Sequence, residues 1–281
     1  MTVRVLSNRR LRVARFSRTV WSYYRAHGRH DMPWRRDTSP YAIVVSEVML
    51  QQTQVSRVVP KFQSWMRRFP SWKSLAAAST KDVLQEWSGL GYNRRALYLR
   101  RAAEAVVADH RGKLPRAYET LVKLPGIGPN TAGAIAAYAF DEPRAFIETN
   151  IRSAFIHSFF PRSRRKVLDA ELMPLVEAAL ALNVRRPREW HWALMDYGAH
   201  LKETLPNPSR RSAHHVRQSR FEGSNRQLRA QLLRTIMEKP ATAAELRKRS
   251  EPHAGGRIDE NLDALAREGF IVCERGRYRI V

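Results

Sequence analysis

Apolar residues recur at helical spacing along most of this chain, and short polar or glycine-containing turns separate the apolar runs. This spacing predicts amphipathic helices. Before residue 220 no run alternates between apolar and polar residues over the length of a strand. The main part of the chain is therefore predicted to be all-α. The expected helices cover residues 16–27, 41–52, 54–69 with a kink or restart at Pro60, 71–78, 83–87, 96–110, 131–140, 150–158, 171–182 and 190–201.

The pattern changes after residue 205. A segment rich in proline, serine, arginine and histidine predicts a basic linker, and three helical runs with a terminal hairpin follow it. Three helices and a hairpin that turns at Arg275-Gly276 are typical of a winged-helix-like α+β module, which either binds duplex DNA or serves as a packing or partner module. The predicted divisions are an irregular basic arm (1–15), the main helical domain (16–205), the linker (206–225) and the C-terminal module (226–281).

One carboxylate interrupts an otherwise apolar helix. The run over residues 41–52 is apolar on nearly every face, which predicts burial, and Glu47 lies within it. Burial among aliphatic side chains raises the pKa of a carboxyl group toward the range that is useful to a general acid. The alternative is a glutamate on a solvated edge of the helix.

A glycine-containing turn precedes the small-residue helix over residues 131–140. Gly126 and Gly128 permit positive φ angles, and Pro129 suits the first turn of a helix. A tight turn that opens a helix presents free N–H groups, and such a concave backbone binds phosphate. The alternative is a plain glycine cap.

The charge balance indicates a polyanionic partner. The 281 residues include 50 lysines and arginines against 26 acidic residues, which gives a net charge of +24. No apolar run approaches the roughly 18 residues of a membrane span, and the arginine-rich first 20 residues do not resemble a secretory signal. The single cysteine, Cys273, excludes an internal disulfide and an all-cysteine metal site. We expect a cytoplasmic protein that acts on nucleic acid.

Six short segments carry a recognisable pattern. They occur in the order found in the adenine DNA glycosylases, and over residues 16–212 the chain resembles that branch of the helix-hairpin-helix superfamily, which also contains endonuclease III. The segments are Pro33-Trp-Arg35, Ser46-Glu-Val-Met-Leu-Gln-Gln-Thr-Gln-Val55, Gly89-Leu-Gly-Tyr92, Leu124-Pro-Gly-Ile-Gly128, Thr131-Ala-Gly-Ala-Ile135 and Ala193-Leu-Met-Asp-Tyr-Gly-Ala199.

The resemblance implies a two-lobed, monomeric, nucleoid-associated enzyme that flips a mispaired base, adenine first, out of duplex DNA and hydrolyses its N-glycosidic bond in base excision repair. Glu47 matches the family's catalytic acid. Glu148 matches the second carboxylate, usually an aspartate, which stabilises the positive charge on the sugar. Asn150 matches an asparagine beside that carboxylate.

Other positions carry over in the same way. Gln52 and Tyr92 match residues that insert into the base stack, while Gly126, Ile127 and Gly128 match the hairpin that grips phosphate. Trp34, Arg35 and Asp196 match residues of the base pocket. Asn130, also assigned to the pocket, occupies the position of the Schiff-base lysine of endonuclease III, so lysine-dependent strand cleavage is not expected and the product is an abasic site.

Two departures bear on cofactor and substrate. The family's iron–sulfur cysteines fall near Lys202, Ser209, Ser212 and Gln218, none of which holds iron, so no cofactor is expected. The family's C-terminal domain, which senses 8-oxoguanine, is replaced by the short module. These departures leave two alternatives open: a glycosylase for mismatched thymine or uracil or for a modified pyrimidine, and a non-catalytic DNA-binding regulator.

Overall fold

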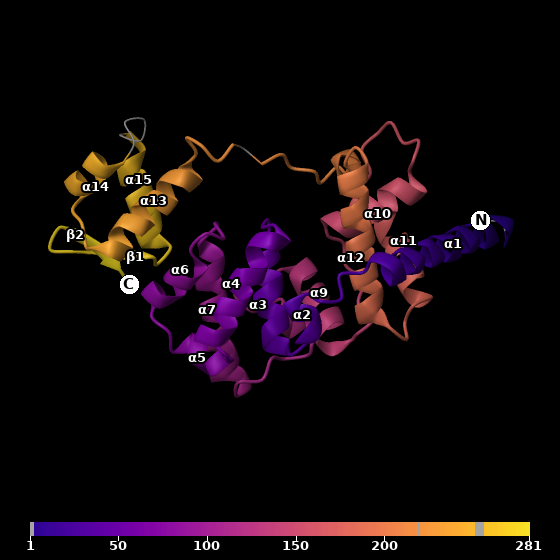
Figure 1. The fold of residues 1–281 in the computed structure, drawn as a ribbon, viewed down its shortest axis with the longest axis horizontal. Coiled ribbons are helices and arrows are strands. Elements are labelled where there is room, and N and C mark those ends of the chain that lie inside the picture. The colour runs from indigo at the N-terminus through magenta and orange to yellow at the C-terminus, as the bar shows by residue number, and fades with distance from the viewer. Residues whose placement is uncertain (1–2, 219, 251–255) are drawn as a thin grey trace. The chain divides into compact units, whose positions relative to one another are not determined.

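The computed structural model describes residues 3–218, 220–250 and 256–281, and these residues are mostly helical (Figure 1). The elements are α1 (Val3–His27), α2 (Pro33–Arg36), α3 (Pro40–Leu50), α4 (Val55–Arg68), α5 (Trp72–Ala76), α6 (Thr80–Trp87), α7 (Arg94–His110), α8 (Tyr118–Leu121), α9 (Pro129–Phe140), α10 (Thr149–Phe159), α11 (Asp169–Ala181), α12 (Pro187–Thr204), the 3-10 turn η1 (Pro208–Arg211), α13 (Asn225–Glu238), α14 (Ala243–Arg249), α15 (Ile258–Arg267), β1 (Ile271–Glu274) and β2 (Arg277–Ile280).

Most predicted helices are confirmed, and the structure differs from the expectations or adds to them at four places. Helix α1 begins at Val3, so residues 3–15 are helical and not an irregular arm. Helix α4 continues through Pro60 without a restart. Residues 33–36, which lie outside every predicted helix, form α2. The expected linker is partly folded, because η1 lies within it and Ser209 is buried.

The chain forms two compact units, and the first contains Met1–Glu47, Arg116–Lys123 and Ile127–Arg217. In this unit α10 packs along α12, and α1 packs on α11 and α12 (Figure 1). The aromatic core is centred on Phe16, whose ring lies 4.7 Å from that of Phe155 and 6.3 Å from that of Trp190. Burial of such large rings supplies much of the apolar surface that stabilises a helical unit.

One glycine sets the distance between α10 and α12. A Cβ atom at Gly198 would lie 2.1 Å from the backbone oxygen of Asn150, which no real side chain permits. The absence of a side chain therefore lets α12 approach the first turn of α10 closely. This contact fixes the backbone of Asn150, one of the predicted site residues.

The second unit contains Val48–Pro115, Leu124–Gly126 and Gln218–Val281. Trp65 and Trp87 are fully buried in it, with ring centroids 5.6 Å apart. Strands β1 and β2 pair antiparallel with Ile271 opposite Ile280. The predicted hairpin turn is confirmed at Arg275 and Gly276, where both φ angles are positive, as two-residue hairpins prefer.

Candidate active site

Glu47 lies on α3 between residues that are almost fully buried. Ser46 and Val48, its neighbours in the chain, are 0% and 3% exposed, whereas Glu47 itself keeps partial access to solvent. Burial first, and then the charge of Glu148, raises the pKa of the Glu47 carboxyl group to about 8. The group is therefore protonated at neutral pH and able to donate a proton.

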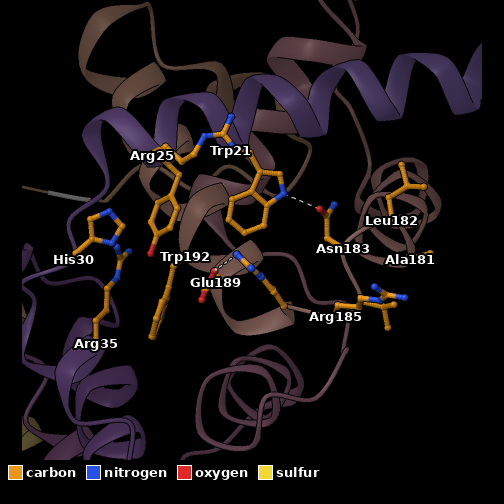
Figure 2. A pocket seen from close by; sticks show the side chains of 13 residues that line it. Trp21, Arg25, His30, Arg35, Ala181, Leu182, Asn183, Arg185, Glu189 and Trp192 are labelled. Atoms are coloured by element: carbon orange, nitrogen blue, oxygen red, sulfur yellow. Dashed lines mark hydrogen bonds and ion pairs between the residues drawn. The ribbon is translucent and has the colours of Figure 1, made fainter.

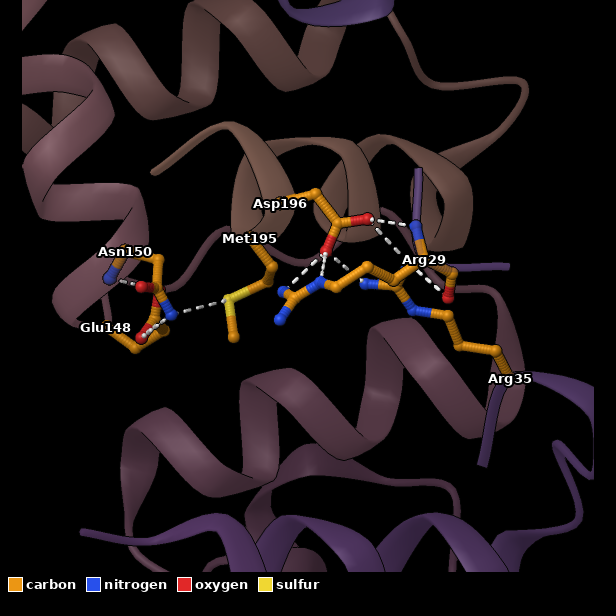
Figure 3. A network of polar contacts seen from close by, with 6 residues as sticks. All are labelled: Arg29, Arg35, Glu148, Asn150, Met195 and Asp196. Atoms are coloured by element: carbon orange, nitrogen blue, oxygen red, sulfur yellow. Dashed lines mark hydrogen bonds and ion pairs between the residues drawn. The ribbon is translucent and has the colours of Figure 1, made fainter. Parts of the chain in front are cut away.

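Glu148 caps the N-terminus of α10 with its side chain. Its Oε1 accepts hydrogen bonds from the backbone N–H groups of Asn150 at 2.6 Å and Ile151 at 2.7 Å. The Asn150 side chain donates to Oε2 at 3.2 Å (Figure 3). Burial raises the pKa of Glu148, although these backbone bonds and two nearby basic side chains oppose the shift. The cap and the helix dipole both favour the ionised carboxylate.

Asp196 is the centre of a buried ion-pair network. Its two oxygens accept from the guanidinium of Arg35 at 2.7 and 2.8 Å, and from the backbone N and Nε of Arg29 at 2.9 and 2.7 Å (Figure 3). Burial opposes ionisation of Asp196, but Arg35 and Arg29 outweigh it and lower the pKa. Its acceptor positions are thus occupied, so Asp196 anchors Arg35 and the chain that leads into α2.

The predicted base-pocket residues do not all come together. Trp34 is buried on α2 beside Arg35, whose side chain is 4% exposed. Met195 lies between the Arg35–Asp196 network and Asn150, which donates to its sulfur at 3.8 Å (Figure 3). Asn130 is different, since it is exposed on the first turn of α9 and does not join the buried residues.

Tyr138 on α9 is a site residue that sequence reasoning missed. Its side chain is 3% exposed, and among the described residues its hydroxyl has no hydrogen-bond partner. Burial, followed by the charges of Glu47 and Glu148, raises its pKa well above the usual value. Its ring stacks on that of Trp192 at 6.2 Å. The only sequence signal was one large polar-tipped side chain in a helix of small residues.

A cavity of about 970 Å³ lies within the first unit on the side of Arg35 (Figure 2). Arg35 is the one predicted site residue that lines it, and the Arg35 guanidinium lies 5.3 Å from the ring of Trp192. On the far side, Trp21 donates to the side chain of Asn183 at 2.7 Å (Figure 2). The cavity is thus walled by aromatic rings and by arginine.

The glycine turn before α9 uses only one left-handed residue. Gly126 has a φ of +77°, as predicted. Gly128 has a φ of −84° and is the N-cap of α9, so it does not use the positive φ that glycine permits. Ile127 is buried between them. Glycine offers no capping side chain at the start of α9, and the N-terminus of a helix favours an anion.

The two residues predicted to enter the base stack lie in the second unit, and both have left-handed backbone angles. The φ angle is +55° at Gln52 and +48° at Tyr92. The hydroxyl of Tyr92 accepts hydrogen bonds from Arg226 at 2.9 Å and from Gln218. The linker and α13 therefore contact Tyr92 directly.

The residues at the family's iron–sulfur positions do not fit a cluster. Ser209 and Ser212 are buried but offer hydroxyl groups, and Ser209 bonds to the side chain of Asn207. Arg211 instead ties this segment to α10, donating to the backbone oxygen of Phe160 at 2.7 Å. Across residues 3–218, 220–250 and 256–281, no three His, Cys, Asp or Glu side chains are grouped as metal ligands. The described helices also include none that is long and apolar enough to cross a membrane.

Comparisons with known proteins identify the class. The family model described as "HhH-GPD superfamily base excision DNA repair protein" matches residues 45–182, and the chain belongs to this superfamily. It is 34% identical to an adenine DNA glycosylase of Mycolicibacterium smegmatis over 265 residues, which cover 87% of this chain and 89% of that relative.

Two further comparisons bear on length and fold. An adenine DNA glycosylase of Buchnera aphidicola subsp. Baizongia pistaciae is 33% identical over 184 residues, which cover 66% of this chain and 52% of that relative, so the chain spans about half its length. A solved thermostable thymine-DNA glycosylase matches with a TM-score of 0.59 and 22% identity, over 67% of this chain and 86% of that one. The predicted helix-hairpin-helix glycosylase fold is confirmed.

Proposed function

We propose that this protein is a monofunctional DNA glycosylase that hydrolyses the N-glycosidic bond of a flipped, mispaired base in duplex DNA, with adenine as its first substrate. The observation that carries the proposal is the pair of glutamates in one unit, both largely shielded from solvent. Their environments separate their roles, because Glu47 has a pKa of about 8 whereas Glu148 caps a helix. Acid-assisted glycoside hydrolysis requires one carboxyl group that gives up a proton and one that stays charged, and a helix cap favours the charged form of Glu148.

In the proposed reaction Glu47 donates its proton to the base as the bond between the base and the sugar C1′ breaks, and the base leaves neutral. The Glu148 carboxylate stabilises the positive charge that develops on the sugar. Asn150 keeps that carboxylate in place through its side-chain hydrogen bond. Water then adds to C1′, and the proton that it loses replaces the one from Glu47.

We assign DNA binding to the turn before α9 and to the two left-handed loops. Gly126, Ile127 and Gly128 would direct backbone N–H groups at a phosphate, while Gln52 and Tyr92 would enter the base stack. Trp34 and Arg35 would border the extracted base, with Asp196 acting through Arg35. Because Asn130 supplies no amine, the product would be an abasic site without lysine-dependent strand cleavage.

Variants of Glu148 test the second carboxylate. We expect Glu148→Asp to keep base release within about tenfold of wild type, because aspartate also caps helices and keeps the charge. Glu148→Gln should lower release by about a hundredfold or more, since a neutral amide no longer stabilises the cationic sugar. Single-turnover rates on one duplex measure both. An aspartate variant as slow as the glutamine variant would contradict a role that depends on charge.

The function itself is tested with a panel of duplexes that carry A·G, A·8-oxoguanine, G·T and G·U pairs. Alkaline cleavage reveals abasic sites, and a parallel sample without alkali reveals strand cleavage. The proposal expects alkali-dependent cleavage at adenine. Cleavage confined to G·T or G·U would favour a pyrimidine glycosylase, whereas tight sequence-specific binding with no abasic product on any duplex would favour a regulator.

A further inference from the structure

The two loops that carry Gln52 and Tyr92 share an unusual backbone feature. Both residues have positive φ angles, which side chains with a Cβ atom rarely adopt. Such conformations persist only where surrounding contacts enforce them. The two loops are separated by about forty residues in the chain, so whatever holds them has to reach both.

Arg95, in the first turn of α7, reaches the first loop. Its side chain is buried, with the residue 9% exposed. The Nη1 atom donates to the backbone oxygens of Val48 at 2.9 Å and Met49 at 3.0 Å, and also to that of Gln51. These carbonyls lie at the C-terminal end of α3 and just beyond it, where a cation is favourable. The residue after Gln51 is Gln52.

The same guanidinium reaches the second loop through its other terminal nitrogen. Nη2 donates to the backbone oxygens of Leu90 at 3.2 Å and Gly91 at 3.0 Å, directly before Tyr92. It also donates at 3.1 Å to the hydroxyl of Thr53, and that hydroxyl donates onward to Leu90 at 3.3 Å. The Arg95 side chain thus donates to backbone oxygens of both the Gln52 loop and the Tyr92 loop.

We propose that Arg95 is a positioning residue that holds the Gln52 and Tyr92 loops at a fixed separation, so that both side chains enter the duplex together. This inference rests on the DNA-inserting roles given to Gln52 and Tyr92 in the proposed function. In this proposal Arg95 acts through its backbone contacts and not through a base. Only a planar guanidinium, with donors that diverge in one plane, spans both loops, because a lysine ammonium is a single point.

The charge needed for these contacts is present at neutral pH. Burial lowers the pKa of Arg95 to about 10, so the guanidinium remains protonated. Two aromatic rings also hold the Arg95 guanidinium in place. It lies 5.1 Å from the ring of Trp87 and 5.6 Å from the ring of Tyr92.

The test compares Arg95→Lys with Arg101→Lys, an exposed arginine of the same helix that bonds only to the backbone oxygen of Glu268 among the described contacts. Each protein binds a duplex that carries 2-aminopurine beside an uncleavable abasic analogue, and the fluorescence increase reports unstacking. We expect Arg101→Lys to match wild type and Arg95→Lys to lose the increase while still binding. Unchanged fluorescence with Arg95→Lys would overturn the proposal, as would a wild-type protein that leaves the stack undisturbed.

Base release separates positioning from a general structural role. Arg95→Lys should release adenine from a mismatch about tenfold or more slowly, because small misplacements of this kind are costly, yet match wild type on adenine already unpaired in a bubble. Equal loss on both substrates would overturn the proposal. If Arg95→Lys fails to fold, Thr53→Val replaces it in the test, because this variant removes the hydroxyl that bridges Arg95 and Leu90. Thr53→Val should lose part of the fluorescence increase. A full fluorescence increase with Thr53→Val would contradict the proposal. Wild-type protein that releases no base refutes the proposed function, whereas the fluorescence still tests Arg95.

Discussion

Replacing Glu47 with glutamine is expected to slow base release severely while the protein stays folded and binds duplex DNA. Glutamine has nearly the same shape as protonated glutamate but cannot give up a proton. General acid catalysis contributes about 10²–10⁴-fold to such reactions, so the single-turnover rate should fall by at least about a hundredfold. Rates on the best duplex of the panel, with binding measured by fluorescence anisotropy, provide the check. Base release near the wild-type rate would remove Glu47 from the role of acid.

The same variant should be more stable than wild type, which separates a catalytic defect from misfolding. The folded Glu47 carboxyl group has a pKa of about 8, whereas its ordinary pKa is 4.5. Between these values the folded state binds more protons than the unfolded state, so stability falls as the pH rises. Glutamine does not ionise, and at pH 7 it should add up to about 3 kcal/mol to the free energy of unfolding. Urea titrations at several pH values measure the difference, and a destabilised variant would contradict this account of Glu47.

The largest loss of stability is expected from Asp196→Asn. The variant leaves the guanidinium of Arg35, 4% exposed, without its anionic partner. Breaking a buried ion pair from one side typically costs about 3–5 kcal/mol, because the remaining charge is buried without compensation. Urea unfolding measures the change.

A surface ion pair provides the matched control. Asp82 pairs with Arg68 at 3.2 Å, but their side chains are 38% and 56% exposed. Exposed pairs contribute about 0–1 kcal/mol, so Asp82→Asn should change the free energy of unfolding little. Similar losses in both variants would show that Asp196 is not the anchor of this network.

Local signals in the sequence predicted much of the fold. Ser79, with an acidic residue three positions later, is typical of a helix N-cap, and it accepts from the backbone N–H of Asp82 at 3.1 Å. The hairpin turn at Arg275 and Gly276 was placed correctly because the turn chemistry is local. The start of α1 was missed because its first residues are basic and carry little apolar periodicity. Helices with a clear apolar stripe could be predicted, whereas the basic first turns of α1 could not.

The candidate site also combines residues that the sequence revealed with contacts that it did not. Glu47 was recognisable because a carboxylate stood out in an apolar run, and its perturbed pKa has the direction that this position indicated. The partners of Asp196 could not be recognised from the sequence, because Arg29 and Arg35 precede Asp196 by more than 160 residues. Arg95 lay just before the predicted helix over residues 96–110, and nothing in the sequence set it apart from the neighbouring arginines. Its buried contacts depend on how two distant loops fold against α7, and no local pattern encodes that arrangement.

The central claim, that Glu47 supplies the proton that lets the base leave, is tested most directly by the pH dependence of single-turnover base release. A group with a pKa of about 8 that acts as an acid requires the rate to fall as the pH rises through that value. The residual rate of Glu47→Gln should not fall as the pH rises through 8. A wild-type rate that stays constant or rises across pH 8, or a glutamine variant that keeps the same falling limb, would contradict the account.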